Sequence, residues 1–201
     1  MKRASRLTVL AHSLACGSAL AASQAPDATV LAGGAVHVVE ASSAGLPGKA
    51  FTAWTLVAAP VPRLCAMVQD YPSYSSYMPN TKSALPVESG DGFVLVDMTL
   101  DLPLGQEKKY RLRLEPQQPD AGQCKLSWRL VPTGLAAKET IADTTGYWLF
   151  KPMPGDSAKT LVEYHVYADP GPVPYGFGWI VDMMSKRSLP RTLEALRGQV
   201  H

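Results

Sequence analysis

The sequence predicts a single α+β domain, in which a curved antiparallel sheet is covered by a C-terminal helix. Two observations predict this fold class. Between residues 35 and 168, several stretches alternate apolar and polar side chains, and short turns rich in Gly and Pro separate most of them. Near the C-terminus, residues 175–199 carry a long amphipathic helical pattern. With 201 residues, 46% of them hydrophobic, the chain is long enough for one packed domain and short for two.

Residues 1–21 have the three-part layout of a secretory signal peptide. Lys2, Arg3 and Arg6 form a positive start, a short apolar stretch follows, and residues 19–21 (Ala-Leu-Ala) fit the pattern of a cleavage site. The apolar stretch is too short and too interrupted to cross a bilayer, which needs ~20 residues. We therefore expect an exported protein, periplasmic or secreted, with a mature chain that starts near residue 22. An ordinary N-terminal helix and a lipid anchor at Cys16 are the alternatives.

Cleavage after residue 21 changes the charge and the cysteine count. The full chain has 19 Lys and Arg against 17 Asp and Glu, a net charge of +2, and three of the basic residues lie in the signal peptide. A mature chain with a net charge of about −1 lacks the basic surface expected of a nucleic-acid partner. Cys65 and Cys124 remain, and either a disulfide or buried thiols would fit them. No metal site is expected, since the sequence has neither a Cys-x-x-Cys nor a paired-histidine motif.

The strands are expected to follow a flexible leader at residues 22–34. Residues 35–201 then form the folded domain. Strand patterns occupy residues 35–40, 49–59, 84–89, 93–102, 108–116, 124–131, 146–152 and 159–168, and we expect about seven strands in one sheet.

Helical patterns flank this series of strands. Residues 63–70 place Leu64, Met67 and Val68 on one helical face. The longer pattern at residues 175–199 contains Pro190, which predicts a kink or a break there. We expect short helices on the N-terminal side of the sheet and one long C-terminal helix.

The alternation in two strands separates a dry face of the sheet from a wet one. Tyr110, Leu112 and Leu114 alternate with charged residues, and Leu126 and Trp128 alternate with Lys, Ser and Arg. The apolar stripe of the C-terminal helix has to be buried, and the dry face is its available partner. A sheet this long curls, and a helix laid across it can leave a cavity.

Residues 70–79, Asp-Tyr-Pro-Ser-Tyr-Ser-Ser-Tyr-Met-Pro, resemble the D-Y-x-x-Y-x-x-x-x-P stretch of the START-like (SRPBCC) superfamily. Within it, the polyketide cyclase/dehydrase and coenzyme-Q-binding branch is the most similar. The resemblance covers roughly residues 36–197, and it implies a helix-grip fold with a deep hydrophobic pocket between sheet and C-terminal helix. Further features that fit it are Ala59-Pro60 with the following helix, Trp128, residues 146–148 (Gly-Tyr-Trp) and residues 160–164.

Aromatic and methionine side chains are the candidates for lining such a pocket. Tyrosine combines an apolar ring with one polar tip, and methionine adapts to irregular ligand shapes. Packing in an ordinary core is the alternative for all of them. The candidates are Tyr71, Tyr74, Tyr77 and Met78 at the mouth, Tyr110, Trp128 and Tyr164 on the floor, and Trp179, Met183 and Met184 in the closing helix.

No catalytic residue is predicted. The Gly-x-Ser-x-Gly motif is absent, and no Ser-His-Asp arrangement follows from the spacing. His165 shares its side of a strand with Glu163 and Tyr167, which favours a surface histidine over a general base. Asp97 and Asp101 are explained equally well by an exposed strand. No cofactor is expected.

These observations and the resemblance together predict an exported START-like protein that binds or carries a lipid, quinone or sterol-like molecule. A polyketide cyclase or aromatase that uses the same pocket is one alternative. A non-catalytic interaction domain with a filled pocket is another. The sequence leaves open a transient contact with a membrane.

Overall fold

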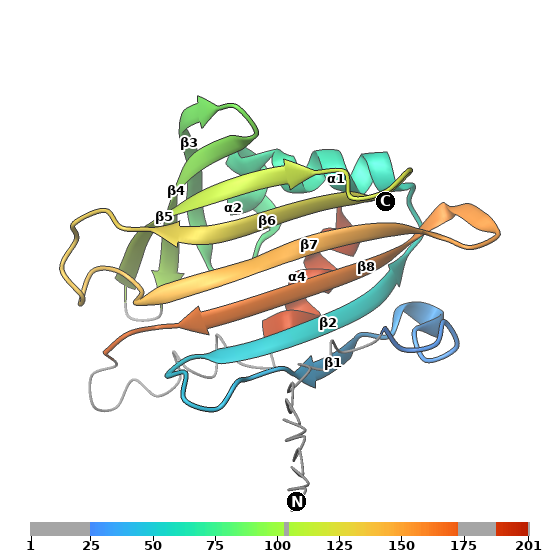
Figure 1. Cartoon of the computed structure of the whole chain (residues 1–201), viewed down its shortest axis with the longest axis horizontal. Coiled ribbons are helices and arrows are strands. Elements are labelled where there is room, and N and C mark those ends of the chain that lie inside the picture. The colour runs from blue at the N-terminus through green and yellow to red at the C-terminus, as the bar shows by residue number, and fades with distance from the viewer. Residues whose placement is uncertain (1–24, 103–104, 173–187, 201) are drawn as a thin grey trace, which may run out of the picture.

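A strongly curved antiparallel sheet with helices on one of its faces forms the body of the protein (Figure 1). The computed structural model describes residues 25–102, 105–172 and 188–200. The predicted α+β class, with an antiparallel sheet, short helices before most of its strands and a C-terminal helix, is confirmed.

All the described strands belong to one eight-stranded sheet, in the order β1-β2-β8-β7-β6-β5-β4-β3. Every neighbouring pair is antiparallel. The sheet exceeds the roughly seven strands expected, because short β1 and outermost β3 both pair as edge strands. In chain order the strands are β1 (His37–Glu40), β2 (Lys49–Val57), β3 (Thr81–Gly90), β4 (Phe93–Leu102), β5 (Gln106–Gln117), β6 (Cys124–Val131), β7 (Asp143–Met153) and β8 (Asp156–Asp169).

The pairing of β2 with β8 joins the two ends of the domain. β2 pairs along its whole length with β8, so that Lys49 lies opposite Ala168 and Val57 lies opposite Thr160. Thr160 Oγ1 also donates a hydrogen bond of 2.7 Å to the backbone oxygen of Ala59, 101 residues away in the sequence. Besides the four-residue strand β1, the first long strand therefore has a partner only when the last strand is present.

The helices between β2 and β3 are short, as expected. They are α1 (Val61–Gln69), η2 (Tyr71–Ser73) and α2 (Tyr74–Tyr77). A proline lies in the first turn of α1, where its missing N–H leaves no hydrogen bond unmade. Of the predicted apolar face of α1, Leu64 and Val68 are fully buried, and Met67 is partly buried against the core.

The C-terminal helix α4 (Ser188–Gly198) packs on the same face of the sheet as α1 and α2; all three lie behind the sheet in Figure 1. Leu189, Leu193 and Leu196 are its buried residues, at helical spacing. Pro190 is the third described residue of α4, and the described helix continues without interruption after it. The part of the predicted helix that precedes Ser188 lies outside the described residues.

Side chains of the inner face, which the helices cover, form the hydrophobic core. This face carries Ala53, Leu114, Leu126 and Trp148, all buried. The outer face is polar over β4 and β5, where the carboxylate of Asp97 accepts hydrogen bonds of 2.6 and 2.9 Å from the Arg111 guanidinium. The predicted separation into dry and wet faces is therefore present in these strands.

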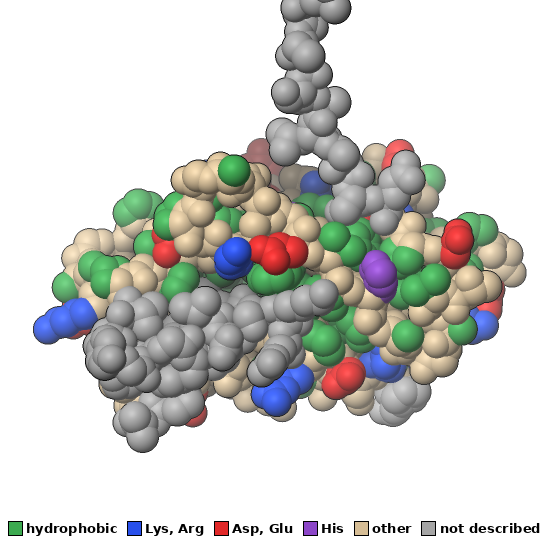
Figure 2. Space-filling view, turned by 90° about the horizontal axis from the view of Figure 1, so that it is seen from below, with side chains coloured by type: hydrophobic (Ala, Val, Ile, Leu, Met, Phe, Trp, Pro, Cys, Tyr) green, Lys and Arg blue, Asp and Glu red, His purple; other side chains and the backbone are tan. Residues whose placement is uncertain are grey.

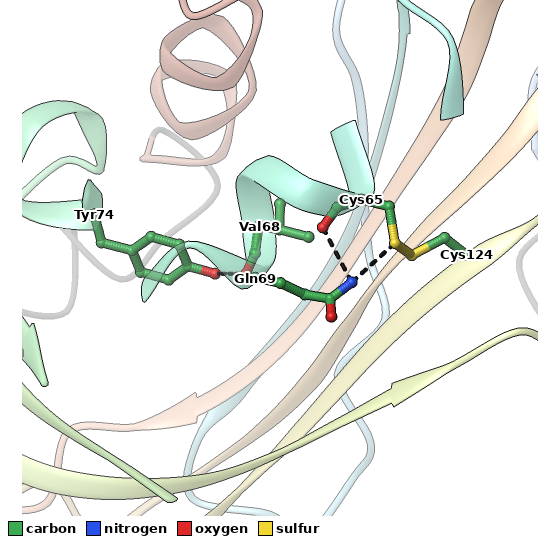
Figure 3. The surroundings of a disulfide bond; sticks show 5 residues. All are labelled: Cys65, Val68, Gln69, Tyr74 and Cys124. Atoms are coloured by element: carbon green, nitrogen blue, oxygen red, sulfur yellow. Dashed lines mark hydrogen bonds between the residues drawn. A yellow bond between two sulfur atoms is a disulfide. The ribbon is translucent and has the colours of Figure 1, made fainter. Parts of the chain in front are cut away.

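A disulfide bond joins Cys65 of α1 to Cys124 at the start of β6 (Figure 3). The side-chain amide of Gln69, one turn further along α1, donates to the Cys65 backbone oxygen at 3.2 Å and to Cys65 Sγ at 3.0 Å. The disulfide therefore attaches α1 covalently to the middle of the sheet.

Several predictions from the sequence concern residues outside the described part of the chain. These are the signal peptide at residues 1–21, the first half of the C-terminal helix and, within it, Trp179, Met183 and Met184. Of the predicted leader, residues 25–34 are described; Leu31 there is fully buried, and η1 (Ala32–Gly34) follows it. Among the described helices, none has the length and apolar character to cross a membrane.

Candidate functional site: an aromatic cavity

A cavity of about 200 Å³ lies where the inner face of the sheet meets α2 and α4. Its described lining comes from β4 to β8, from α2 with the residues that follow it, and from the first turns of α4. The aliphatic part of the lining includes Met78, Met98, Leu100, Leu112, Leu114 and Leu189. The aromatic part consists of Tyr74, Tyr110, Trp128, Trp148 and Tyr164.

Three of these aromatic rings lie against one another along β6, β7 and β8. The ring centroid of Tyr164 is 4.1 Å from that of Trp148 and 5.7 Å from that of Trp128. The alternation of each strand brings the three side chains to the inner face, because Trp148 lies opposite Tyr164 in the register of β7 and β8. Together the rings form one continuous aromatic wall of the cavity.

Glycine at position 146 makes room for this wall. A Cβ atom there would lie 2.3 Å from Trp128 Cζ2 and 2.3 Å from the backbone oxygen of His165. Real Cβ atoms essentially never approach other atoms so closely. The absence of a side chain at Gly146 therefore lets the Trp128 ring approach the backbone of β7.

Tyr74 contributes its ring to the cavity, while its hydroxyl is engaged elsewhere. The hydroxyl donates a hydrogen bond to the backbone oxygen of Val68 in α1 (Figure 3). Burial, followed by the nearby Tyr77 and Tyr71, raises the pKa of Tyr74 well above its ordinary value. Tyr74 thus couples the cavity wall to α1, and through α1 to the disulfide.

Tyr110 and Tyr164 carry polar tips that no described residue engages. Neither hydroxyl takes part in a hydrogen bond within the described part of the chain. Burial raises the pKa of both groups, so that both stay protonated near neutral pH. Both are therefore neutral groups that can donate a hydrogen bond.

The remaining polar side chains of the lining are uncharged. They are Asn80, Thr81, Thr144, Ser188 and Thr192. Thr144 Oγ1 donates to the backbone oxygen of Tyr167 at 2.8 Å, and Thr192 Oγ1 to that of Ser188 at 3.2 Å. Among the described residues that line the cavity, none is Asp, Glu, Lys, Arg or His.

A buried lysine fixes the loop between β6 and β7, which supplies Ile141 to the cavity. Lys108 Nζ donates hydrogen bonds to the backbone oxygens of Thr140 at 2.7 Å and Ala137 at 3.3 Å. Burial lowers the pKa of Lys108. The ammonium group holds the loop in place beside the cavity without lining it.

The structure brings some of the candidate residues from the sequence together at the cavity. Tyr74, Met78, Tyr110, Trp128 and Tyr164 line it. Tyr71 and Tyr77 are not among its described lining: Tyr71 is buried in the core, and the Tyr77 hydroxyl donates to the Met67 backbone oxygen at 3.2 Å. Trp179, Met183 and Met184 lie outside the described residues.

Trp148 is the main lining residue that the candidate set omits. It is fully enclosed in the aromatic wall, only 3% exposed. The signal for it was present in the sequence, since Trp148 alternates with Tyr147 and Leu149 and shares its side of the strand with Gly146 and Phe150. Thr144 and Ile141 also line the cavity, and no pattern in the sequence distinguishes them.

The ionisable residues considered from the sequence lie away from the cavity. His165 is on the outer face, where its Nδ1 is 2.9 Å from Thr52 Oγ1 and its ring stacks on Tyr147. Burial lowers the pKa of His165, although the nearby Glu163 opposes this. Asp97 is engaged by Arg111, and neither residue lines the cavity.

The described residues offer no cluster of three or more His, Cys, Asp or Glu that could hold a metal ion. On the face seen from the β1 side in Figure 2, acidic and basic side chains are interspersed among hydrophobic ones. The described side chains of that face form no continuous positive surface of the kind expected of a nucleic-acid interface.

The comparisons with known proteins identify the same fold in two kinds of structure. No protein-family model matches the chain, and no curated protein matches it in sequence. The STAR-related lipid transfer protein of Xanthomonas axonopodis is similar with a TM-score of 0.68 and 18% identity, over 82% of this chain and 92% of that one. Human StAR-related lipid transfer protein 5 is similar with a TM-score of 0.69 and 15% identity, over 83% of this chain and 81% of that one.

An enzyme has the same architecture. The Zhui aromatase/cyclase of a Streptomyces species is similar with a TM-score of 0.58 and 16% identity, over 82% of this chain and 93% of that one. At these identities the likeness establishes the fold: the chain has the helix-grip fold of START-like structures, as its sequence predicts. The choice between binding and catalysis depends on the residues of the cavity.

Proposed function

We propose that this protein is an exported START-like protein that binds or carries a hydrophobic small molecule in the cavity between its sheet and its helices. The observation that carries the proposal is the cavity of about 200 Å³ with its aromatic and aliphatic lining. An apolar cavity of ~150 Å³ is already large enough to take up benzene. Burial of apolar ligand surface would supply the affinity, at about 25 cal/mol per Å² before entropic costs.

The structural neighbours support a ligand of lipid character. Two of them are named as lipid transfer proteins, and both share most of their length with this chain. Lipid, quinone and sterol-like molecules all combine a large apolar surface with few polar groups, which is what an apolar cavity with a few polar tips accommodates.

Binding is favoured over cyclase or aromatase activity by the chemistry of the lining. Acid–base catalysis needs a positioned group that exchanges a proton near the working pH. The described lining offers tyrosines whose pKa is raised by burial, and it contains no carboxylate, imidazole or amine. This composition is typical of a site that holds a ligand.

Export is proposed on two grounds. Residues 1–21 have the layout of a signal peptide. The Cys65–Cys124 disulfide is of the kind that persists in oxidising compartments such as the bacterial periplasm or the extracellular space. Both grounds support a periplasmic or secreted location.

Native mass spectrometry and organic extraction of protein purified from the periplasm of a bacterial host test the proposed function. We expect a hydrophobic molecule to co-purify with the wild type in a defined ratio. Val166→Phe, which adds volume at a lining position, should reduce its occupancy, whereas Val87→Phe, at a position 48% exposed on β3, should not. An empty protein that also fails to take up added fatty acids, quinones and sterols would contradict the proposal.

A further inference from the structure

The polar tips of Tyr110 and Tyr164 are the least explained feature of the cavity. The two residues reach it from β5 and β8, and the raised pKa of Tyr164 is due to burial first and to the nearby Tyr110 second. Buried hydroxyl groups ordinarily have a hydrogen-bond partner, because an unpaired one loses its hydration without compensation. Neither of these hydroxyls has a partner among the described residues.

Both tyrosines line the cavity. The fully buried side-chain nitrogen and oxygen atoms without a partner, within the described part of the chain, are Trp54 Nε1 and Arg197 Nε, and neither tyrosine hydroxyl belongs to that set. A ligand in the cavity would therefore lie against both tyrosine side chains.

The chemistry around these hydroxyls restricts what they can bind. The described lining has no charged side chain that could neutralise an anion or a cation, and burying an unpaired charge is strongly unfavourable. The tyrosines stay protonated near neutral pH because burial raises their pKa. What remains is a pair of neutral donors beside an aromatic wall, on which a flat ring system can stack.

We propose that Tyr110 and Tyr164 select neutral, flat ligands that carry a hydrogen-bond-accepting oxygen, such as a ketone or quinone carbonyl, over hydrocarbons of the same shape. This inference rests on the proposed function of the cavity and specifies the chemical class of its ligand. The hydroxyls act as donors to the ligand oxygen, and the wall formed by Trp128, Trp148 and Tyr164 provides the stacking surface.

Fluorenone and fluorene test the proposal, because they share one flat ring system and differ in a single carbonyl oxygen. Their dissociation constants are measured by equilibrium dialysis for the wild type and for the double variant Tyr110→Phe/Tyr164→Phe. Tyr167→Phe, on the outer face of β8, is the matched control. The ratio of the two constants in each protein is compared, so that the different hydrophobicity of the probes cancels.

We expect the preference of the wild type for fluorenone to fall by about fivefold in the double variant, the contribution of one ordinary hydrogen bond. The preference should be unchanged in Tyr167→Phe. If the preference for fluorenone in the double variant stays within about twofold of the wild-type value, the inference is overturned, because the free-energy changes of independent substitutions add only to about that accuracy. Equal affinity of the wild type for both probes overturns it as well, while leaving the proposed function intact.

A second measurement uses the wild type and does not depend on the folding of a variant. The carbonyl stretching band of bound fluorenone should lie at lower frequency than in hexane, since a hydrogen bond weakens the carbonyl bond. A band at the hexane position overturns the inference. If the wild type binds neither probe, the inference fails, and an empty protein in the extraction experiment would then show that the proposed function has failed too.

Discussion

The double variant Cys65→Ala/Cys124→Ala removes the covalent link between α1 and β6. It also removes the restriction that the disulfide places on the conformations of the unfolded chain. The closed loop spans a sequence separation of 59 residues. In the chain-entropy model, opening a closed loop of this size lowers the free energy of unfolding by about 4 kcal/mol. Two truncated side chains add a smaller loss, because Cys124 is buried and Cys65 partly so.

Urea unfolding followed by tryptophan fluorescence measures this effect. With a urea dependence of about 2 kcal/mol per M, typical of small proteins, the midpoint of the variant should fall by about 2 M. The wild type treated with a reductant should show a similar loss. The variant itself should be insensitive to the reductant, which serves as the internal control.

Midpoints that agree within about 0.5 M for the oxidised wild type, the reduced wild type and the variant would refute the reasoning. Such a result would mean that the unfolded chain gains little freedom when the loop is opened. A second expected effect concerns the cavity, since Tyr74 is hydrogen-bonded to Val68 of α1. Release of α1 should therefore weaken ligand binding as well as stability. If the loss of the disulfide affected only the unfolded chain, ligand binding would be unchanged.

Three other perturbations have defined outcomes. Gly146→Ala should lower the unfolding free energy in urea titrations by about 1–3 kcal/mol, because the new Cβ would lie 2.3 Å from both Trp128 and a backbone oxygen. In Gly155→Ala the new Cβ would have no atom within 4 Å, so this variant measures the cost of a side chain at positive φ without a steric clash. Leu193→Ala, at a fully buried position of α4, should cost about 2–5 kcal/mol and lower the thermal midpoint; a loss below about 1 kcal/mol would mean that α4 is not packed as described. Burial lowers the pKa of His165 below its ordinary 6.5, so the unfolded state binds more protons just below pH 6.5 and stability should fall on acidification. In His165→Gln this part of the pH dependence should disappear from the unfolding free energy, and an unchanged pH profile would contradict the assignment.

Much of the fold followed from the sequence because strand alternation is set by local geometry. Tyr110, Leu112 and Leu114 point to one side whatever the neighbouring strands do, so the dry face could be predicted. The pairing of β2 with β8 could not be read from such a pattern, because alternation says nothing about which distant strand is the neighbour. The resemblance around residues 70–79 implied the helix-grip fold as a whole, and no pairing of individual strands was predicted from it.

The site was harder to predict than the fold, for a physical reason. Tyr71, Tyr74 and Tyr77 are spaced three apart across η2 and α2, yet only Tyr74 among them is part of the described cavity lining. Which ring faces the cavity depends on how two one-turn helices meet α1, and in particular on the bond from the Tyr74 hydroxyl to Val68. Sequence spacing does not contain that information. The pairing of Cys65 with Cys124 depends on the same tertiary contact of α1 with β6.

The pairing of β2 with β8 has a consequence for the order in which the protein can fold. Lys49 and Ala168 are partners although they are separated by most of the domain, and the other neighbouring strand, β1, is only four residues long. A chain that has emerged from the ribosome only as far as β7 has no long partner for β2, so the hydrophobic inner side of that strand stays exposed to water. Distant pairings of this kind slow folding, because the entropy of closing a long loop is lost before its contacts form. We therefore expect the nascent chain to remain unfolded until β8 is synthesised. This delay prolongs the period in which the proposed export of the protein could begin with an unfolded chain.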